Sequence, residues 1–136
     1  MKIVAIGAGA WGRNVIRNLE ALSVLSGIVE SNNERLNDYA SEHPDLSLFA
    51  DWRAALASDC DGVAIATPTA THYEIAAAAL AAGKDVFVEK PMTPTSAQAQ
   101  ALANLAEREG RILMVGHLLL YQPAIAWMKE YIEAGK

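Results

Sequence analysis

The sequence predicts an α/β protein built on a doubly wound parallel sheet with helices on both faces. Short runs of β-branched residues alternate with longer patterns rich in alanine and leucine, which is typical of consecutive βαβ units. Residues 63–66 and 86–88 are nearly continuous apolar runs, as expected for central strands that helices cover on both sides. A glycine-rich turn joins the first run to the first helical pattern. Right-handed crossovers then give the strand order 3-2-1-4-5-6, with a ligand crevice at the carboxyl ends of the strands.

Six short runs are predicted as strands. The first leads straight into the glycines, the second ends in the acidic Glu30, and the fourth and fifth belong in the centre of the sheet because they are almost entirely apolar. In order along the chain, the predicted strands are Lys2–Ile6, Leu25–Glu30, Ser47–Phe49, Gly62–Ala66, Asp85–Val88 and Ile112–Val115.

Six helices are predicted between and after these strands, and several of their ends carry a signal. Asp51 suits an N-cap, and Thr71 suits another because Glu74 follows three residues later. Gly83 and Gly110 fall where a left-handed C-terminal turn is expected. The predicted helices are Trp11–Leu22, Glu34–Glu42, Trp52–Ala57, His72–Ala82, Ser96–Arg108 and Pro123–Ala134.

The glycine turn has the spacing of a dinucleotide-binding fingerprint, placed between a strand and a helix. Gly7 permits the tight turn, Gly9 lets the backbone approach a pyrophosphate, and Gly12 lets the helix pack against the sheet. Ala10 and Trp11 complete the turn at the helix N-terminus, where free backbone amides favour an anion.

Glu30 stands about 20 residues past the glycines, where a carboxylate accepts both ribose hydroxyls of the adenosine half. Residues 31–33 contain no arginine for a 2′-phosphate, and the Glu30 charge would repel one, so NAD is favoured over NADP. The alternative for Glu30 is a solvated carboxylate at a strand end.

Thr67 and Pro68 follow the fourth strand, where the backbone of such a fold passes the pyrophosphate and the nicotinamide ribose. An ordinary strand-to-helix turn is the alternative for both residues. His72 is a further candidate for cofactor contact, and the alternative for it is a packed or solvated histidine near a helix start.

Glu89 and Lys90 directly follow the buried fifth strand, at the place where a nicotinamide and a reacting hydroxyl would meet. A lysine there orients ribose or substrate hydroxyls and exchanges a proton with the alcohol during hydride transfer, so Lys90 is the predicted catalytic residue. Glu89 either holds the ammonium or binds ribose. The alternative is an ion pair on the rim that contributes little.

Composition restricts the class of protein. The 136 residues carry 11 basic and 16 acidic side chains, a net charge of −5, without a basic run suited to nucleic acid. The single cysteine, Cys60, lies between two aspartates and is predicted to be a bystander. No apolar stretch reaches the length of a membrane span, so we expect a soluble, cytoplasmic protein without membrane contact, and we expect no metal site.

The motifs GAGAWG, ATPTATHYEIAAAALAAGKDVFVEKPM and LMVGHLLLYQPA, together with Glu30, resemble the Gfo/Idh/MocA family of oxidoreductases over essentially the whole chain. The resemblance implies a Rossmann domain that binds NAD or NADP, with Lys90 at the nicotinamide in binding and catalysis. Glu89 and Pro91 match the acidic residue and the proline of the family's EKP motif, whose proline often follows a cis peptide bond.

Two departures from the family pattern qualify this resemblance. His117 and the residues up to Tyr121 stand where many members carry two arginines. This form is more similar to members that act on sugar nucleotides, so His117 and Tyr121 are candidates for the substrate side, although His117 equally suits capping or packing. Members also continue into a C-terminal α/β domain, so residues 1–120 are expected to form the dinucleotide-binding domain and residues 121–136 a helix that leads toward a missing substrate domain.

The sequence therefore predicts the cofactor-binding half of a dehydrogenase that moves hydride between a nicotinamide and a secondary alcohol of a sugar-type substrate, with little or no turnover by this chain alone. The alternative is a stand-alone dinucleotide sensor or interaction module without catalysis, and another nucleotide in the same crevice is a third possibility. A stand-alone module should have a self-sufficient surface, whereas a cofactor domain without its second domain is expected to expose an apolar face that favours a homo-oligomer. This face comprises Tyr121, Ile125, Trp127, Met128 and Ile132.

Overall fold

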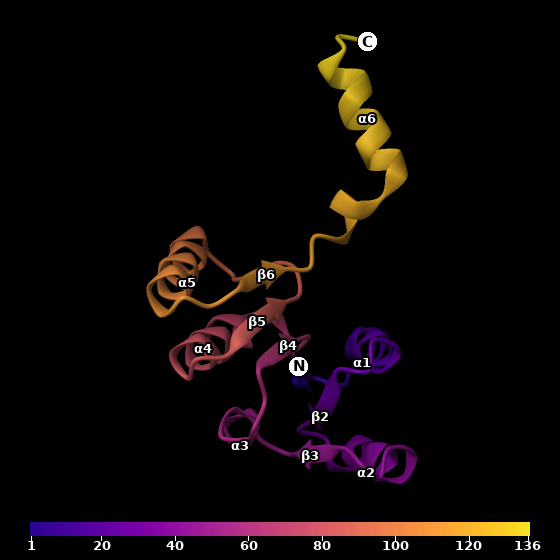
Figure 1. Cartoon of the computed structure of the whole chain (residues 1–136), viewed down its shortest axis with the longest axis vertical. Helices are drawn as coiled ribbons and strands as arrows, with labels where there is room; N and C mark the ends of the chain where they lie inside the picture. The colour runs from indigo at the N-terminus through magenta and orange to yellow at the C-terminus, as the bar shows by residue number, and fades with distance from the viewer.

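The computed structural model describes all residues 1–136 and contains one six-stranded sheet in which every paired strand is parallel. The order is β3-β2-β1-β4-β5-β6, which confirms the predicted topology (Figure 1). The strands are β1 Ile3–Ile6, β2 Leu25–Val29, β3 Ser47–Phe49, β4 Gly62–Ile65, β5 Asp85–Val88 and β6 Leu113–Val115.

Helices flank the sheet on both sides. In Figure 1, α1 and α2 lie on one side, and α3, α4 and α5 lie on the other. The helices are α1 Gly12–Ala21, α2 Asn33–Glu42, α3 Trp52–Leu56, α4 Thr69–Ala81, α5 Ser96–Glu109 and α6 Pro123–Glu133, with a short 3₁₀ helix η1 at Leu118–Tyr121. None of these helices has both the length and the apolar character that a membrane span requires.

The core is divided by the sheet into two clusters. Val4 and Ile6 of β1 belong to the larger cluster, whereas Ala5 between them belongs to the smaller one, as the alternation of side chains along a strand requires. The larger cluster includes most of the buried residues of β4, β5, α4 and α5, and it also contains Cys60. Ile16 of α1 lies in the smaller cluster.

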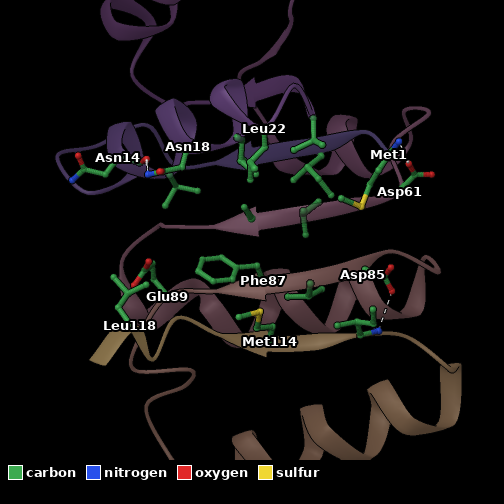
Figure 2. Close-up of a pocket in the computed structure, with 18 of the residues that line it drawn as sticks. Met1, Asn14, Asn18, Leu22, Asp61, Asp85, Phe87, Glu89, Met114 and Leu118 are labelled. Atoms are coloured by element: carbon green, nitrogen blue, oxygen red, sulfur yellow. Dashed lines mark hydrogen bonds and ion pairs between the residues drawn. The ribbon is translucent and has the colours of Figure 1, made fainter. Parts of the chain in front are cut away.

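One face of the sheet is only partly covered. A cavity of about 570 Å³ lies between α1 and the exposed side of β4, β5 and β6. Figure 2 shows Asn18 of α1 and Leu22, which directly follows α1, on one side of this cavity and Phe87 and Met114 on the other, with Glu89 at one end. The helix α6 does not fill it, because this helix projects away from the sheet (Figure 1).

Most ends of helices and strands agree with the prediction to within one or two residues, but α4 begins earlier. It starts at Thr69 rather than His72, and Pro68 occupies its N-cap position in an extended conformation. Thr71 is therefore inside the helix and is not an N-cap, and its hydroxyl donates to the Pro68 carbonyl over 2.8 Å. The physical reason is that proline has a preset φ and lacks an N–H, so a helix can begin directly after it.

The other predicted helix ends are confirmed. Asp51 caps α3 by accepting a hydrogen bond from the Arg53 backbone N–H. Gly83 and Gly110 both have left-handed backbones, at φ 72° and 61°. Two further N-caps were not predicted: Asn32 caps α2, and Thr95 caps α5.

Candidate functional site

The candidate site lies where the carboxyl ends of β1, β2, β4 and β5 meet the start of α1. The strand order reverses between β1 and β4, and a crevice at such a switch point is where open α/β sheets bind ligands. The predicted glycine turn, Glu30, Thr67 and Glu89 all follow strands at this edge.

The three glycines of the turn serve different purposes. Gly7 has φ +94°, and a Cβ there would lie 3.0 Å from the Ala66 carbonyl group and the Thr67 Cγ2. A Cβ on Gly12 would collide with the Gly7 carbonyl oxygen. A Cβ on Gly9 would meet only the Arg35 Nη1, at 3.7 Å. The fold therefore requires Gly7 and Gly12, whereas Gly9 keeps open the approach to the turn.

Consecutive backbone N–H groups in this turn have no acceptor within the chain. The N–H of Gly7 donates to Val29 and that of Arg13 donates to Gly9, but the four residues from Gly9 to Gly12 donate no hydrogen bond. Trp11 occupies the N-cap position of α1 and offers no side-chain cap. Free amides at a helix N-terminus attract anions, so the turn is suited to a phosphate or pyrophosphate.

Glu30 is buried, with 5% exposure, so it is not a solvated carboxylate. Its Oε2 accepts a hydrogen bond from the Ala8 N–H over 3.2 Å, and its Oε1 accepts one from the Asn32 N–H over 2.9 Å. These bonds tie the end of β2 to the glycine turn. The carboxylate has further lone pairs with which it can accept hydrogen bonds from the hydroxyl groups of a ligand.

Arg35 is a site residue that the sequence prediction missed. Its Nη1 lies 3.6 Å from the Glu30 Oε2, and its side chain is 40% exposed. It belongs to the first turn of α2, two residues beyond the segment 31–33, which contains no arginine. Sequence separation hides this proximity, because the turn into α2 brings position 35 back over the end of β2.

Thr67 and His72 are connected through the loop after β4. Thr67 contacts the glycine turn through its methyl group, and its hydroxyl oxygen lies within hydrogen-bond distance of the Thr71 hydroxyl, at 2.8 Å. His72 is 1% exposed, and both of its ring nitrogens face backbone carbonyls. Pro68 is exposed at the edge of this loop. His72 is therefore a packed histidine whose ring does not reach solvent.

Glu89 and Lys90 are neighbours without an ion pair between them. The Glu89 side chain is 8% exposed, its Oε2 accepts a hydrogen bond from the Lys90 N–H over 3.3 Å, and its carboxylate packs closely on Gly116. Lys90 is exposed, and its ammonium has no salt bridge or hydrogen bond within the chain. The peptide bond between Lys90 and Pro91 is cis, as the family resemblance implied.

The candidates for the substrate side differ in position. His117 follows Gly116, which contacts Glu89, so it lies near the carboxyl ends of the strands. Tyr121 ends η1 with 72% exposure and makes no side-chain hydrogen bond. The structure therefore brings His117 toward the site and leaves Tyr121 in solvent.

The fold and the site define a class of protein: a dinucleotide-binding domain with a Rossmann fold. The chain belongs to the Gfo/Idh/MocA family, because the model of that family, described as an oxidoreductase family with an NAD-binding Rossmann fold, matches residues 1–117.

Relatives and solved structures agree with this assignment. UDP-N-acetylglucosamine 3-dehydrogenase of Acidithiobacillus ferrooxidans is 33% identical over 96% of this chain and 41% of its own length. The crystal structure of that enzyme superposes with a TM-score of 0.86 at 34% identity, covering 96% of this chain and 43% of the other. This chain thus spans less than half the length of such relatives.

The proteins similar to this chain include ones associated with NAD and ones associated with NADP. The structure of GenD2 from gentamicin A biosynthesis, solved in complex with NAD, matches with a TM-score of 0.84 at 31% identity over 90% of this chain and 36% of the other. The NADP-dependent scyllo-inositol 2-dehydrogenase of Bacillus subtilis is 29% identical over 79% of this chain and 33% of its own length. The matched proteins therefore include one solved with NAD and one named for NADP.

Proposed function

We propose that residues 1–120 are the cofactor-binding domain of a dehydrogenase that transfers hydride between a nicotinamide and a secondary alcohol of a sugar or nucleotide-sugar substrate. The main support is the row of four unpaired backbone N–H groups from Gly9 to Gly12 after β1, with the buried Glu30 at the end of the neighbouring strand β2 and Lys90 after β5 at the same edge of the sheet. Residues 121–136 are a separate helical segment in this proposal.

The residues of the turn and of the neighbouring loops fit a bound dinucleotide. The amides from Gly9 to Gly12, which include Ala10 and Trp11, would hold the pyrophosphate, and Glu30 would accept the ribose hydroxyls of the adenosine half. Thr67 and Pro68 would line the nicotinamide half. A nicotinamide, when bound, supplies the hydride acceptor or donor.

Lys90 is the proposed catalytic residue. Its ammonium is exposed and has no partner in the chain, so it is available to hydrogen-bond a substrate or ribose hydroxyl and to exchange a proton with the alcohol. Glu89, buried next to it, would hold the backbone of Lys90 through its 3.3 Å hydrogen bond rather than pair with the ammonium.

The substrate side of the proposal rests on the relatives, which act on UDP-N-acetylglucosamine and on inositol. His117 is the proposed lining residue, with Tyr121 further out. We expect this 136-residue chain to bind cofactor with little or no turnover, because those relatives are more than twice its length and a reacting carbinol needs complete positioning.

The test is a calorimetric titration of the purified chain with NAD and with NADP, alongside Glu30→Ala and the control Glu34→Ala. Glu34 is an exposed carboxylate in the first turn of α2. We expect NAD to bind more tightly than NADP, and Glu30→Ala to weaken NAD binding about tenfold, as expected for the loss of hydrogen bonds to a charged group. Absence of binding of either nucleotide by the folded chain would contradict the proposal.

One observation speaks against the alternative, a stand-alone module without catalysis, because such a module should have a self-sufficient surface without a large exposed apolar face. The helix α6 exposes a large apolar surface, with Trp127 at 62% and Ile132 at 68% exposure, and the Trp127 ring stacks on Tyr131. We propose that this face mediates self-association. Sedimentation of the Trp127→Glu, Ile132→Glu double variant tests it, because an unchanged molecular mass would rule this face out as the contact.

A further inference from the structure

His72 joins two loops that belong to neighbouring strands. Its Nε2 lies 2.8 Å from the Thr67 carbonyl oxygen in the loop after β4, and its Nδ1 lies 2.9 Å from the Pro91 carbonyl oxygen in the loop after β5. Both partners are acceptors. A neutral imidazole donates to one of them, and an imidazolium donates to both.

The hydrogen bond from His72 connects the loop after β5 to a different element of the fold. Residues 90–94 make no other hydrogen bond to a different strand or helix, since the Lys90 N–H donates to the adjacent Glu89 and the Thr93 hydroxyl donates to Thr95. Met92 packs against the core farther along the loop. The orientation of the backbone beside Lys90 therefore depends on the ring of His72.

The bond to Thr67 extends the connection to the glycine turn. The Thr67 methyl group lies against Gly7, and the Thr71 hydroxyl holds the Thr67 hydroxyl from the same helix turn that carries His72. A continuous path therefore runs from the glycine turn through Thr67 and His72 to Pro91 and Lys90. The ring at the centre of this path is 1% exposed and cannot itself touch a ligand in the crevice.

We infer that His72 is a positioning residue, which sets the distance between the loop of Thr67 and the loop of Lys90 and thereby shapes the nicotinamide half of the site. This inference rests on the proposed function, because it assigns these two loops to the nicotinamide end. A merely structural core residue, when replaced, would weaken the binding of both halves of a dinucleotide. Replacement of His72 should weaken the binding of the nicotinamide half alone.

The experiment compares the affinities for NAD and for ADP, which lacks both the nicotinamide and its ribose. His72→Gln retains a donor group at this position, and His43→Gln is the control, because His43 caps the opposite end of α2 from Glu30. We expect wild type and His43→Gln to bind NAD more tightly than ADP. In His72→Gln, NAD binding falls about fivefold, as expected for one lost hydrogen bond, while ADP binding is unchanged.

Three results would overturn the inference. Equal weakening of both ligands in His72→Gln would indicate a structural role, unchanged NAD binding would indicate no role, and equal affinities in wild type would mean that the nicotinamide half makes no net contact. If wild type binds neither ligand, the proposed function itself fails. Should His72→Gln not fold, the exchange of the wild-type ring N–H decides: slower exchange with NAD than with ADP at equal saturation supports the inference, and equal exchange with both ligands contradicts it.

Discussion

Gly9 and Gly12 lie three positions apart in one turn, yet the structure gives them different tasks. A methyl group at Gly9 has open space apart from Arg35, so Gly9→Ala should fold normally and weaken NAD binding about tenfold by blocking the approach of a pyrophosphate. A methyl group at Gly12 meets the Gly7 carbonyl, so Gly12→Ala should lower the free energy of unfolding by about 1–3 kcal/mol. Urea unfolding and NAD titration of both variants measure the two effects.

The matched control for these substitutions is Gly110→Ala. Gly110 has a positive φ but no atom near its Cβ position, and it lies at the far end of α5. It should lose stability without a change in NAD affinity. If Gly9→Ala bound NAD as tightly as wild type, this result would contradict the proposal that the turn binds the pyrophosphate.

Arg35 should determine how well the chain tolerates NADP. Its guanidinium lies beside the carboxylate that would hold the adenosine ribose, which is where a 2′-phosphate would be located. We therefore expect Arg35→Ala to weaken NADP binding about tenfold while NAD binding changes little, since charge-assisted bonds to phosphate are the stronger ones. Arg17→Ala, on the exposed side of α1, is the control. If Arg35→Ala lowered the affinities for NAD and for NADP equally, Arg35 would act only by positioning Glu30.

Several of these residues could be predicted from the sequence because their task is local. The spacing of Gly7, Gly9 and Gly12 and the position of Glu30 after an apolar run follow from the chain order alone. Arg35 and the bonds of His72 could not be predicted, because they depend on how α2 and the loop after β5 return to the sheet edge. A histidine in a sequence does not reveal which carbonyls its ring will face.

The helix α5 illustrates a signal that the sequence contained and the prediction did not use. Thr95 is followed three residues later by Gln98, which is the spacing of a capping box, and its hydroxyl accepts a hydrogen bond from the Gln98 N–H over 3.3 Å. Thr95→Ala should therefore lower the free energy of unfolding by about 1 kcal/mol. Ser41→Ala, an exposed hydroxyl inside α2, should have a much smaller effect in the same urea titration.

The strand pattern was the most predictable part of the fold. The apolar run of β4 is buried throughout, as its lack of polar alternation indicated. In β5 only Val86 and Val88 are buried, and Phe87 lines the cavity on the partly covered face, so the expectation that helices cover both faces of this strand was wrong there. The start of α4 was less predictable, because the spacing of Thr71 and Glu74 competes with the signal of Pro68 directly before Thr69. Proline prevailed because its fixed φ already suits the residue before a helix.

The uncovered face of the sheet should be detectable in solution. The cavity between α1 and β4–β6 is mostly apolar, and Leu22 and Met114 on its two sides are 70% and 42% exposed. A dye that fluoresces in apolar surroundings should bind there, and the Leu22→Lys, Met114→Lys double variant should lose most of the fluorescence. Leu119→Lys is the control, since Leu119 is equally accessible on η1 but does not line the cavity. Equal loss in both variants would place the dye elsewhere.

Cys60 is the only thiol of the chain, and it is buried in the larger core cluster with 5% exposure. A thiol reagent can therefore modify it only after the structure opens, so the labelling rate reports the population of opened molecules. A ligand that binds only the folded chain lowers that population in proportion to its saturation. The rate at which a thiol reagent modifies Cys60 should therefore fall as cofactor is added, and this decrease measures cofactor affinity without a label attached to the protein beforehand.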